Sequence, residues 1–578
     1  MPLLRRARAA AIGTALLATG ALAIPQLAHA DAVRDVSAGC VQGGPVLRYL
    51  VVFPDGTTSA DAASRIAAAC GGTTIYYAQI AVAVATSADP DFGQRIGPDR
   101  AYSAEAVAYA NDRRVDAGPK TDEVPADRDG LTTGSSADST RDLAGQQWDM
   151  AMVKANRAHR IDEGSHRVLV GVLDSGIDPD HPNLTGELDR SASAGCVTGA
   201  PDTSESAWVP TTSSHGTHVA GTIAAADDGS GTAGVAPGVR VASVKVVDDD
   251  GYIYPEAAVC GIMWAAREGM AIANNSYFVD PWVFTCADAP GQHVIYQALD
   301  RAVTYATRHG VLSIAAAGNA GVDLTDPGQD SRSPDNVDSD DQVQRQLGPD
   351  CAQLPAGIPG VVTVSAVGAD GVKASYSSYG LGAIDVTAPG GDPLQRGQCV
   401  LSTVPGGYAR SCGTSMAAPH AAGVAALLAS THPDATPAQL RSMLDDEADP
   451  IACPGDYDLN GTGAQDAYCT GDSTYNSFYG HGMVDALAAV APAATATTAN
   501  QAQQSHPAEP AQRATTTPHA TKPAAPPGAT YMPSQSAGAD PATPTSTPAP
   551  TPVVPTVPAA PVTPAGGPVG GFALLGNW

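Results

Sequence analysis

Short apolar runs that alternate with helical stretches restrict the fold of residues 148–490 more than any other feature of the chain. The runs are rich in valine and isoleucine and almost continuous; they are residues 167–173, 239–247, 270–274, 311–317 and 361–367. Strands without polar alternation are buried on both faces. We therefore expect a doubly wound α/β fold, in which a mostly parallel sheet carries helices on both faces.

A separate pattern precedes this region. Within residues 31–115, an extended run at 47–53, a helical run at 59–69 and an alternating run at 73–86 predict a small α+β domain with the order strand, helix, strand. The following residues, 116–147, are polar and almost free of bulky apolar side chains. Such a composition is typical of an exposed linker that proteases can cut.

The first 30 residues have the pattern of a secretory signal peptide. Three arginines precede an apolar stretch that ends near residue 24, and Ala28-His29-Ala30 matches a cleavage site. The alternative is a membrane anchor, but the stretch is shorter than the roughly 20 residues of a membrane span. We expect a secreted, extracellular protein with no membrane span beyond the signal peptide.

The composition describes an acidic chain with an unstructured end. The net charge of −28 argues against nucleic-acid binding and fits a soluble extracellular protein. Residues 491–578 consist mainly of alanine, proline and threonine, and Tyr531 is their only aromatic residue before Phe572. We expect a disordered tail, because such a segment cannot build an apolar core.

Ten cysteines fit an exported protein, because disulfides persist in oxidising compartments. Two lie in the predicted α+β domain and eight in residues 148–490, so each segment can pair its own cysteines. Proximity suggests the pairs Cys40–Cys70, Cys399–Cys412 and Cys453–Cys469, and the sequence leaves the other connections open. No Cys-x-x-Cys spacing supports a metal-binding or catalytic cysteine.

Three short segments carry side chains suited to nucleophilic catalysis. Asp174 ends an apolar run, His215 opens a helix in the sequence His-Gly-Thr-His, and Ser415 precedes an alanine-rich helix in Gly-Thr-Ser-Met-Ala-Ala-Pro. Each alone has an ordinary explanation: a turn-forming acid, a structural histidine and a serine N-cap. His215 and His218 also have the spacing of a metal pair, but the pattern His-Glu-x-x-His is absent. Taken together, they supply the base that accepts a serine proton and the acid that orients this base.

The three segments, in the order Asp174, His215, Ser415, closely resemble those of the subtilase family of serine proteases. The resemblance spans residues 148–490 and implies a subtilisin-like fold and a serine endopeptidase that forms an acyl-enzyme intermediate. It assigns the oxyanion role to Asn319, with the backbone N–H of Ser415 as the second donor. The implied substrates are proteins or peptides, the chemistry requires no cofactor, and we expect a monomer.

The resemblance extends to substrate binding. Ser276 matches the end of the family's substrate-pairing strand, and Gly318 is the second expected substrate-binding residue. Phe278 stands where the family has a glycine that opens the primary specificity pocket. Its ring either narrows this pocket or points away from it, so the family's broad preference for large apolar side chains does not transfer to this chain.

The α+β domain at 31–115 resembles the inhibitory propeptide of the family. This resemblance implies a zymogen whose own propeptide acts as an intramolecular inhibitor, with activation by cleavage within the linker 116–147. Two other functions remain open: a dedicated processing protease like the mycosins, which end in a membrane helix, and a catalytically inactive subtilase that binds peptides or cell wall. The four matching residues, Asp174, His215, Ser415 and Asn319, argue against an inactive protein.

One acidic segment has two interpretations, a calcium-binding loop or an acidic loop without a metal. Asp456, Asp458, Asn460 and Asp466 resemble a calcium loop in two overlapping registers, but neither register supplies a carboxylate at the twelfth position. We favour an acidic loop closed by a Cys453–Cys469 disulfide, and a structural calcium ion is the alternative. Residues 480–486 resemble the segment that closes subtilase domains, which sets the predicted domain end near residue 490.

Overall fold

The computed structural model describes residues 39–41, 44–97, 99–110, 141–337, 342–394 and 398–491. The predicted signal peptide (1–30), most of the linker (116–140) and the predicted tail beyond residue 491 lie outside the described residues. The described residues all fall within one unit of the chain, Met1–Thr495.

The first described elements form a four-stranded antiparallel sheet in the order β2-β3-β1-β4. The strands are β1 (Leu47–Val52), β2 (Gly72–Tyr77), β3 (Val82–Ser87) and β4 (Ala101–Tyr102), and the helices are α1 (Ser59–Ala68), α2 (Phe92–Ile96) and α3 (Ala104–Ala110). Val51, Phe53 and Ile66 pack in a small core between the sheet and α1. We call residues 47–110 the N-terminal domain.

The prediction of a single strand at 73–86 is wrong, because these residues form two strands. Residues 78–81 make a turn between β2 and β3, and Ala81 adopts a positive φ of 52°. The alternation of apolar residues continues through the turn, so the sequence pattern does not reveal the break.

The predicted parallel sheet is present, with seven strands in the order β15-β14-β10-β8-β5-β7-β6 and every neighbouring pair parallel. The strands are β5 (Leu169–Asp174), β6 (Ala194–Gly195), β7 (Arg240–Lys245), β8 (Ile272–Asn275), β10 (Leu312–Ala316), β14 (Val362–Val367) and β15 (Val386–Pro389). Each of the five predicted apolar runs overlaps one of these strands, which confirms the doubly wound α/β fold.

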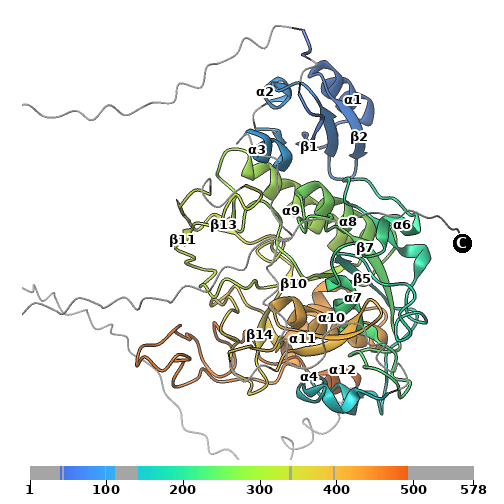
Figure 1. The fold of residues 1–578 in the computed structure, drawn as a ribbon, viewed down its shortest axis with the longest axis vertical. Helices are drawn as coiled ribbons and strands as arrows, with labels where there is room; N and C mark the ends of the chain where they lie inside the picture. Colours follow the sequence, from blue (N-terminus) through green and yellow to red (C-terminus); the bar gives the residue numbers. More distant parts are fainter. Residues whose placement is uncertain are drawn as a thin grey trace, which may run out of the picture. The chain divides into compact units, whose positions relative to one another are not determined.

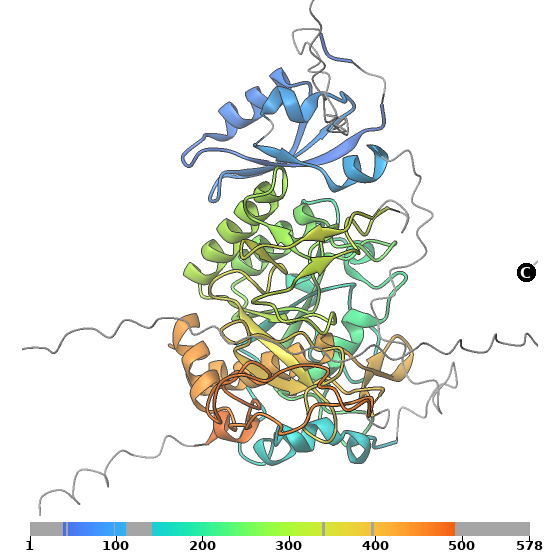
Figure 2. The ribbon, with the colours of Figure 1, turned by 90° about the vertical axis from the view of Figure 1, so that its left-hand side faces the viewer.

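Helices cover both faces of this sheet. One face carries α4 (Trp148–Met152), α5 (Ala155–Ala158), α7 (His215–Ala224), α10 (Thr414–Thr431), α11 (Pro437–Asp446) and α12 (Ala486–Val490), and the other carries α8 (Pro255–Arg267) and α9 (Gln292–Arg308). Successive side chains of β5 alternate between the two layers: Val170 and Val172 join the first, Leu169 and Leu173 the second. Figure 1 shows β5, β7 and β10 between α8 and α9 above and α10 below, and Figure 2 shows the same succession from the side.

Shorter elements and five disulfides complete the described structure. The short elements are η1 (Ala144–Gln146), η2 (Arg190–Ala192), α6 (Glu205–Trp208), β9 (Thr285–Cys286), β11 (Gln329–Asp330), β12 (Arg345–Gln346), β13 (Cys351–Ala352), β16 (Val400–Val404) and β17 (Gly407–Ser411). The three predicted pairs, Cys40–Cys70, Cys399–Cys412 and Cys453–Cys469, are confirmed. Cys196–Cys260 and Cys286–Cys351 are the other two. Within the described ranges, no helix has both the length and the apolar character that crossing a bilayer requires.

Candidate active site

Three predicted site residues lie at or just beyond the ends of adjacent strands of the large sheet. Asp174 is the last residue of β5, Ser276 comes directly after β8, and Asn319 lies three residues beyond the end of β10. The strands β10, β8 and β5 are neighbours in the sheet. Because the carboxyl ends of parallel strands open onto one edge, the fold brings these residues to the edge where α/β proteins place their sites.

Asp174 and His215 form a hydrogen-bonded pair. His215 begins α7, and its Nδ1 lies 2.8 Å from Asp174 Oδ1, which also accepts the backbone N–H of Ser175 at 2.7 Å. Asp174 is 1% exposed, whereas the His215 side chain is 17% exposed. The buried carboxylate therefore fixes the ring so that Nδ1 carries the proton and Nε2 is left to accept one.

A glycine makes this approach of α7 to β5 possible. A Cβ built on Gly216 would lie 2.5 Å from the carbonyl oxygen of Gly176 and 3.1 Å from Asp174 Cβ. Any larger residue at 216 would push the start of α7 away from the strand end. The small residues around His215 thus have the structural role that the sequence pattern suggested.

Ser415 lies in the first turn of α10 and is joined to Ser276 by two hydrogen bonds. Its Oγ donates to the Ser276 carbonyl oxygen at 3.1 Å, and Ser276 Oγ donates to the Ser415 carbonyl oxygen at 2.9 Å. The second bond is possible because Pro419, four residues on, has no N–H with which to pair this carbonyl within the helix. Ser276 therefore anchors the backbone of Ser415 in addition to its expected place on the substrate strand.

Asn319 is held by Thr414, a residue that the sequence did not single out. Asn319 Oδ1 accepts the backbone N–H of Thr414 at 2.9 Å and its hydroxyl at 2.8 Å. Both bonds engage the carbonyl end of the amide, which leaves Nδ2 as the outward donor. A Cβ built on Gly413 would lie 3.5 Å from Asn319 Nδ2 and 3.6 Å from the Ser415 nitrogen, so the two predicted oxyanion donors border the same space.

A buried pair ties α10 to the beginning of the predicted catalytic region. His420 Nδ1 lies 2.7 Å from the Met416 carbonyl oxygen, and Nε2 lies 3.1 Å from Asp149 Oδ2. The side chains of His420 and Asp149 are both fully buried. Since Met416 directly follows Ser415, this contact links residues near 149 to the helical turn that carries the serine.

The other expected substrate-binding residues lie beside this edge. Phe278 packs against an apolar cluster that contains Val283, Phe284 and the Cys286–Cys351 disulfide. Gly318 has a φ of +89°, a left-handed conformation that favours glycine, directly before Asn319. The Phe278 ring therefore has apolar partners in the structure, in the cluster around this disulfide.

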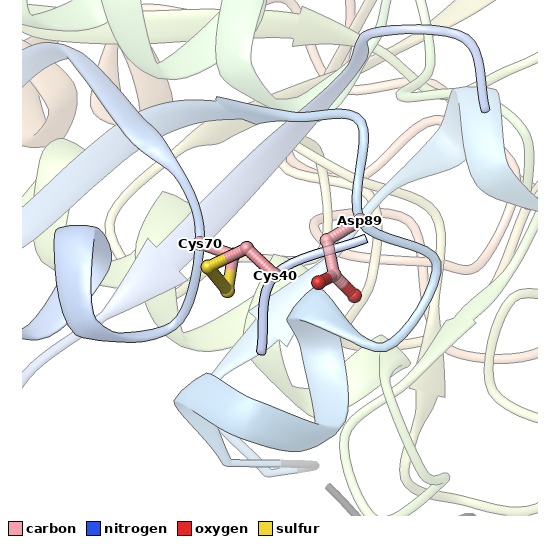
Figure 3. Close-up of side chains that lie close together, drawn as sticks. All are labelled: Cys40, Cys70 and Asp89. Atoms are coloured by element: carbon pink, nitrogen blue, oxygen red, sulfur yellow. A yellow bond between two sulfur atoms is a disulfide. The ribbon is translucent and has the colours of Figure 1, made fainter. Parts of the chain in front are cut away.

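Two groups of side chains within the described part of the chain are close enough to share a metal: Cys40, Cys70 and Asp89, and Cys286, Asp350 and Cys351. In each group the two cysteines form a disulfide, so they offer no thiolate. Figure 3 shows Asp89 next to the Cys40–Cys70 bond. Asp89 Oδ2 accepts the backbone N–H of Val41 at 2.9 Å. These groups are better explained as structural contacts than as metal sites.

His218, the second residue of the candidate metal pair, is buried in α7. Its Nε2 lies 3.1 Å from the Val400 carbonyl oxygen. Burial lowers the pKa of His218 to about 3, which keeps the ring neutral. Its surroundings are those of a structural histidine.

The carboxylates of the candidate calcium loop bond within the loop itself. Asp458 accepts the backbone N–H groups of Thr462 and Gly463 at 3.0 and 2.6 Å. Asp466 Oδ1 accepts from Asn460 Nδ2 at 2.6 Å, and Asp456 Oδ1 accepts from Gln465 Nε2 at 2.6 Å. Carboxylates that accept hydrogen bonds within the loop fit the favoured acidic loop better than a set of free calcium ligands. Calcium binding stays a prediction.

Comparison with known proteins identifies the family. The sequence model described as the subtilase family matches residues 165–482, which include Asp174, His215, Asn319 and Ser415. The chain belongs to the subtilase family. As a member of this family, the protein belongs to the class of serine-type endopeptidases.

Individual relatives match different shares of this subtilase. It is 30% identical over 373 residues to fervidolysin of Fervidobacterium pennivorans, which covers 60% of this chain and 45% of that protein. It is 33% identical over 321 residues to subtilisin BL of Lederbergia lenta, which covers 55% of this chain and 96% of that protein. The subtilase thus spans about half the length of the first relative and nearly all of the second.

A solved structure shows the same fold over more of the chain. The epidermin leader peptide processing serine protease of Staphylococcus aureus superposes with a TM-score of 0.56 at 20% identity. The superposition covers 77% of this subtilase and 98% of that protein. This is a larger share than residues 165–482 make up, so the likeness of fold extends beyond the family match.

Proposed function

We propose that this subtilase is a secreted endopeptidase that hydrolyses peptide bonds in protein substrates through an acyl-enzyme on Ser415. The observation that carries the proposal is the 2.8 Å contact between His215 and the buried Asp174, at the sheet edge where Asn319 and Ser276 also lie. Asp174, His215 and Ser415 form the catalytic triad in this proposal, and Asn319 is the side-chain oxyanion donor.

The chemistry begins with proton transfer from Ser415 to His215. The hydroxyl donates to the Ser276 carbonyl in the resting structure, so it must rotate toward His215 Nε2 when substrate binds. Oγ then attacks the scissile carbonyl carbon while Nε2 accepts the proton, and Asp174 stabilises the imidazolium. His215 passes this proton to the departing amine nitrogen, and a water molecule hydrolyses the acyl-enzyme by the same route.

The oxyanion of each tetrahedral intermediate falls between two donors. Asn319 Nδ2 and the Ser415 backbone nitrogen border the space beside Gly413. Thr414 holds the Asn319 amide in place before substrate arrives. Donors fixed in advance need no reorganisation as the charge develops, and such electrostatic stabilisation is commonly the largest single contribution to catalysis.

We further infer that residues 31–115 form an inhibitory propeptide, and that cleavage within 116–147 activates the enzyme. Polar contacts with the catalytic region support this inference: Tyr77 donates to the Gly199 carbonyl oxygen at 2.8 Å, and Trp282 Nε1 donates to the Tyr102 hydroxyl at 2.7 Å. Apolar residues of β1 and β3 belong to the same core cluster as α8 and α9. A domain packed in this way can assist folding, and we infer that it also blocks the active site until it is removed.

Export is the remaining part of the proposal. The signal-peptide pattern of residues 1–30 and five disulfides support secretion, because such bonds persist in oxidising compartments. We propose that the mature enzyme is an extracellular monomer that needs no cofactor for its chemistry. A structural calcium ion in the loop near Asp458 remains part of the hypothesis.

Replacement of the nucleophile tests the proposal. Ser415→Ala should abolish casein hydrolysis, and Ser430→Ala, at the other end of α10, should leave it intact. If maturation is autocatalytic, Ser415→Ala should also accumulate as the uncut precursor. Casein hydrolysis by a purified, contaminant-free Ser415→Ala protein would contradict the mechanism, and normal trimming of this variant would assign maturation to another protease.

A further inference from the structure

A buried glutamine side chain lies directly against the expected substrate-binding glycine. A Cβ built on Gly318 would overlap Gln353 Oε1 and lie only 2.7 Å from its Cδ, so the carboxamide covers the bare Cα of Gly318. Gln353 is 6% exposed, and its Oε1 is buried without a hydrogen-bond partner among the described residues. A buried amide oxygen in this state is costly unless a ligand supplies a donor.

The backbones on both sides of this contact are fixed. Gly318 donates its N–H to Thr414 Oγ1 at 3.1 Å and accepts the Ser378 N–H at 2.9 Å. The Gln353 carbonyl oxygen accepts the Gly357 N–H at 2.7 Å. The backbones on both sides of the carboxamide are therefore held by hydrogen bonds.

The Phe278 segment runs beside the Gln353 segment. Val279 donates its N–H to the Leu354 carbonyl oxygen at 3.0 Å, which joins the residues that follow Phe278 and Gln353. The Cys286–Cys351 disulfide links the same two segments covalently, and Phe278 packs against it. Gln353 is thus built into one wall with Phe278, next to Gly318.

This wall lies where the substrate residue before the scissile bond must place its side chain. Asn319 receives the carbonyl oxygen of that residue in the proposed mechanism, and a single atom separates its carbonyl carbon from its Cβ. Gly318 directly precedes Asn319, so the side chain passes the Gly318 backbone and meets the Gln353 carboxamide. A large apolar side chain would find little room there and would leave the buried amide oxygen unsatisfied.

We propose that Gln353 determines which residue is accepted before the scissile bond, and that this residue carries a small, uncharged polar side chain such as that of serine, threonine or asparagine. The inference rests on the proposed function. The carboxamide offers both a donor and an acceptor, so it can pair with a hydroxyl or an amide. A site that pairs with a polar substrate group discriminates strongly against an isostere that lacks this group.

Fluorogenic peptides with isosteric pairs at this position test the inference: asparagine against leucine and threonine against valine. We expect wild-type kcat/KM to favour the polar member of each pair by about tenfold or more. Gln353→Leu keeps the volume and should remove this preference, whereas Gln353→Gly should open the pocket and raise cleavage after phenylalanine. Gln346→Leu, at an exposed glutamine of the same region, is the control.

Titration of Ser415 with a phosphonate reagent distinguishes a failure of the Gln353 inference from a failure of the proposed function. Labelled wild-type enzyme that cleaves after leucine and valine as well as after asparagine and threonine would overturn the Gln353 inference and leave the proposed function standing. A polar preference that persists in Gln353→Leu would also overturn it. Wild-type enzyme that neither labels nor cleaves would refute the proposed function itself. If Gln353→Gly does not fold, the wild-type ratios and Gln353→Leu still decide the question.

Discussion

The two faces of the seven-stranded sheet pack against different parts of the molecule. One face holds α7 and α10, from which His215 and Ser415 come, and the other holds α8 and α9, against which the N-terminal domain packs. Alternate residues of β5 serve the two layers, so a single strand supports both. We therefore expect that the proposed catalytic contacts and the contacts with the N-terminal domain can be altered separately.

The two faces also differ in how they treat polar groups. At the proposed active site, Asp174 and Asn319 accept hydrogen bonds that fix their orientation. On the other face, Glu256 of α8 is 2% exposed and lies 3.7 Å from Arg48 of the N-terminal domain. Burial raises the pKa of Glu256 to about 7, and it outweighs the opposing attraction of Arg48. The polar groups of the proposed site are thus held by hydrogen bonds, whereas the other face buries a carboxyl group whose pKa is raised to about 7.

The largest effect should come from Asn319, the proposed oxyanion donor. Removal of one such donor from a subtilisin lowers kcat by about 10²–10³-fold, and we expect the same order for Asn319→Ala with a small change in KM. The matched change is Asn336→Ala at the contact with the N-terminal domain, where Asn336 Nδ2 donates to the Ala104 carbonyl oxygen. It should leave kcat of the mature enzyme unchanged. Steady-state kinetics measure kcat of both variants. Equal kcat values for Asn319→Ala and wild type would contradict the oxyanion role of Asn319.

The buried pair behind α10 should matter for stability. Asp149→Ala leaves a buried nitrogen of His420 without its partner, and we expect a loss of about 3 kcal/mol. Asp227→Ala removes a comparable but more exposed contact, 3.2 Å from His159, and should cost less than about 1 kcal/mol. Urea unfolding in the Ser415→Ala background, which prevents autolysis, gives both values. Similar losses in the two variants would contradict the role assigned to Asp149.

Association of the N-terminal domain should weaken as the pH rises. Glu256 binds its proton more tightly in the complex than when exposed, so the proton stabilises the complex. This stabilisation is complete below the ordinary carboxyl pKa and is lost as the pH rises through about 7. We expect the domain to bind about 10- to 100-fold more weakly at pH 8 than at pH 5.

Linker-nicked Ser415→Ala protein allows this measurement, by chromatography at the two pH values after cleavage within 116–140. Glu256→Gln should flatten the pH dependence, because the amide does not titrate. Glu268→Gln, at a residue just beyond the end of α8, is the control. Equal retention of the domain at both pH values, or a dependence that survives in Glu256→Gln, would show that another group governs release.

The smallest effect concerns the acidic loop. If Asp456, Asp458, Asn460 and Asp466 bind calcium, a chelator should lower the Tm by a few degrees, since a ligand that binds only the folded state stabilises it. Asp458→Asn should then reduce the difference between chelated and calcium-loaded samples. An unchanged Tm on chelation would leave only the loop closed by Cys453–Cys469.

Much of the fold could be predicted because buried parallel strands leave continuous apolar runs. Two strands of the seven-stranded sheet were not predicted, and both have weak signals: β6 has two residues, and β15 is four residues long and ends in Pro389. The split of the run at 73–86 was missed because apolar alternation continues across the turn. Local pattern therefore predicts a long buried strand well and a short or interrupted strand poorly.

The candidate site divides in the same way. Asp174, His215, Ser415 and Asn319 lie in short motifs, so the sequence alone indicated them. The supporting residues act across long separations: Thr414 bonds to Asn319 over 95 positions, and Asp149 contacts His420 over 271. Gln353 meets Gly318 only through the tertiary fold. No local sequence pattern predicts such partners.

Active-site labelling tests the catalytic assignment most directly. Purified mature enzyme would be treated with a serine-directed phosphonate, digested and analysed by mass spectrometry, with the Ser415→Ala protein treated in parallel. We predict one stoichiometric adduct on Ser415, loss of casein hydrolysis in proportion to labelling, and no adduct on Ser415→Ala. An enzyme that hydrolyses casein while its Ser415 stays unlabelled, or that is inactivated through another residue, would contradict the proposed triad.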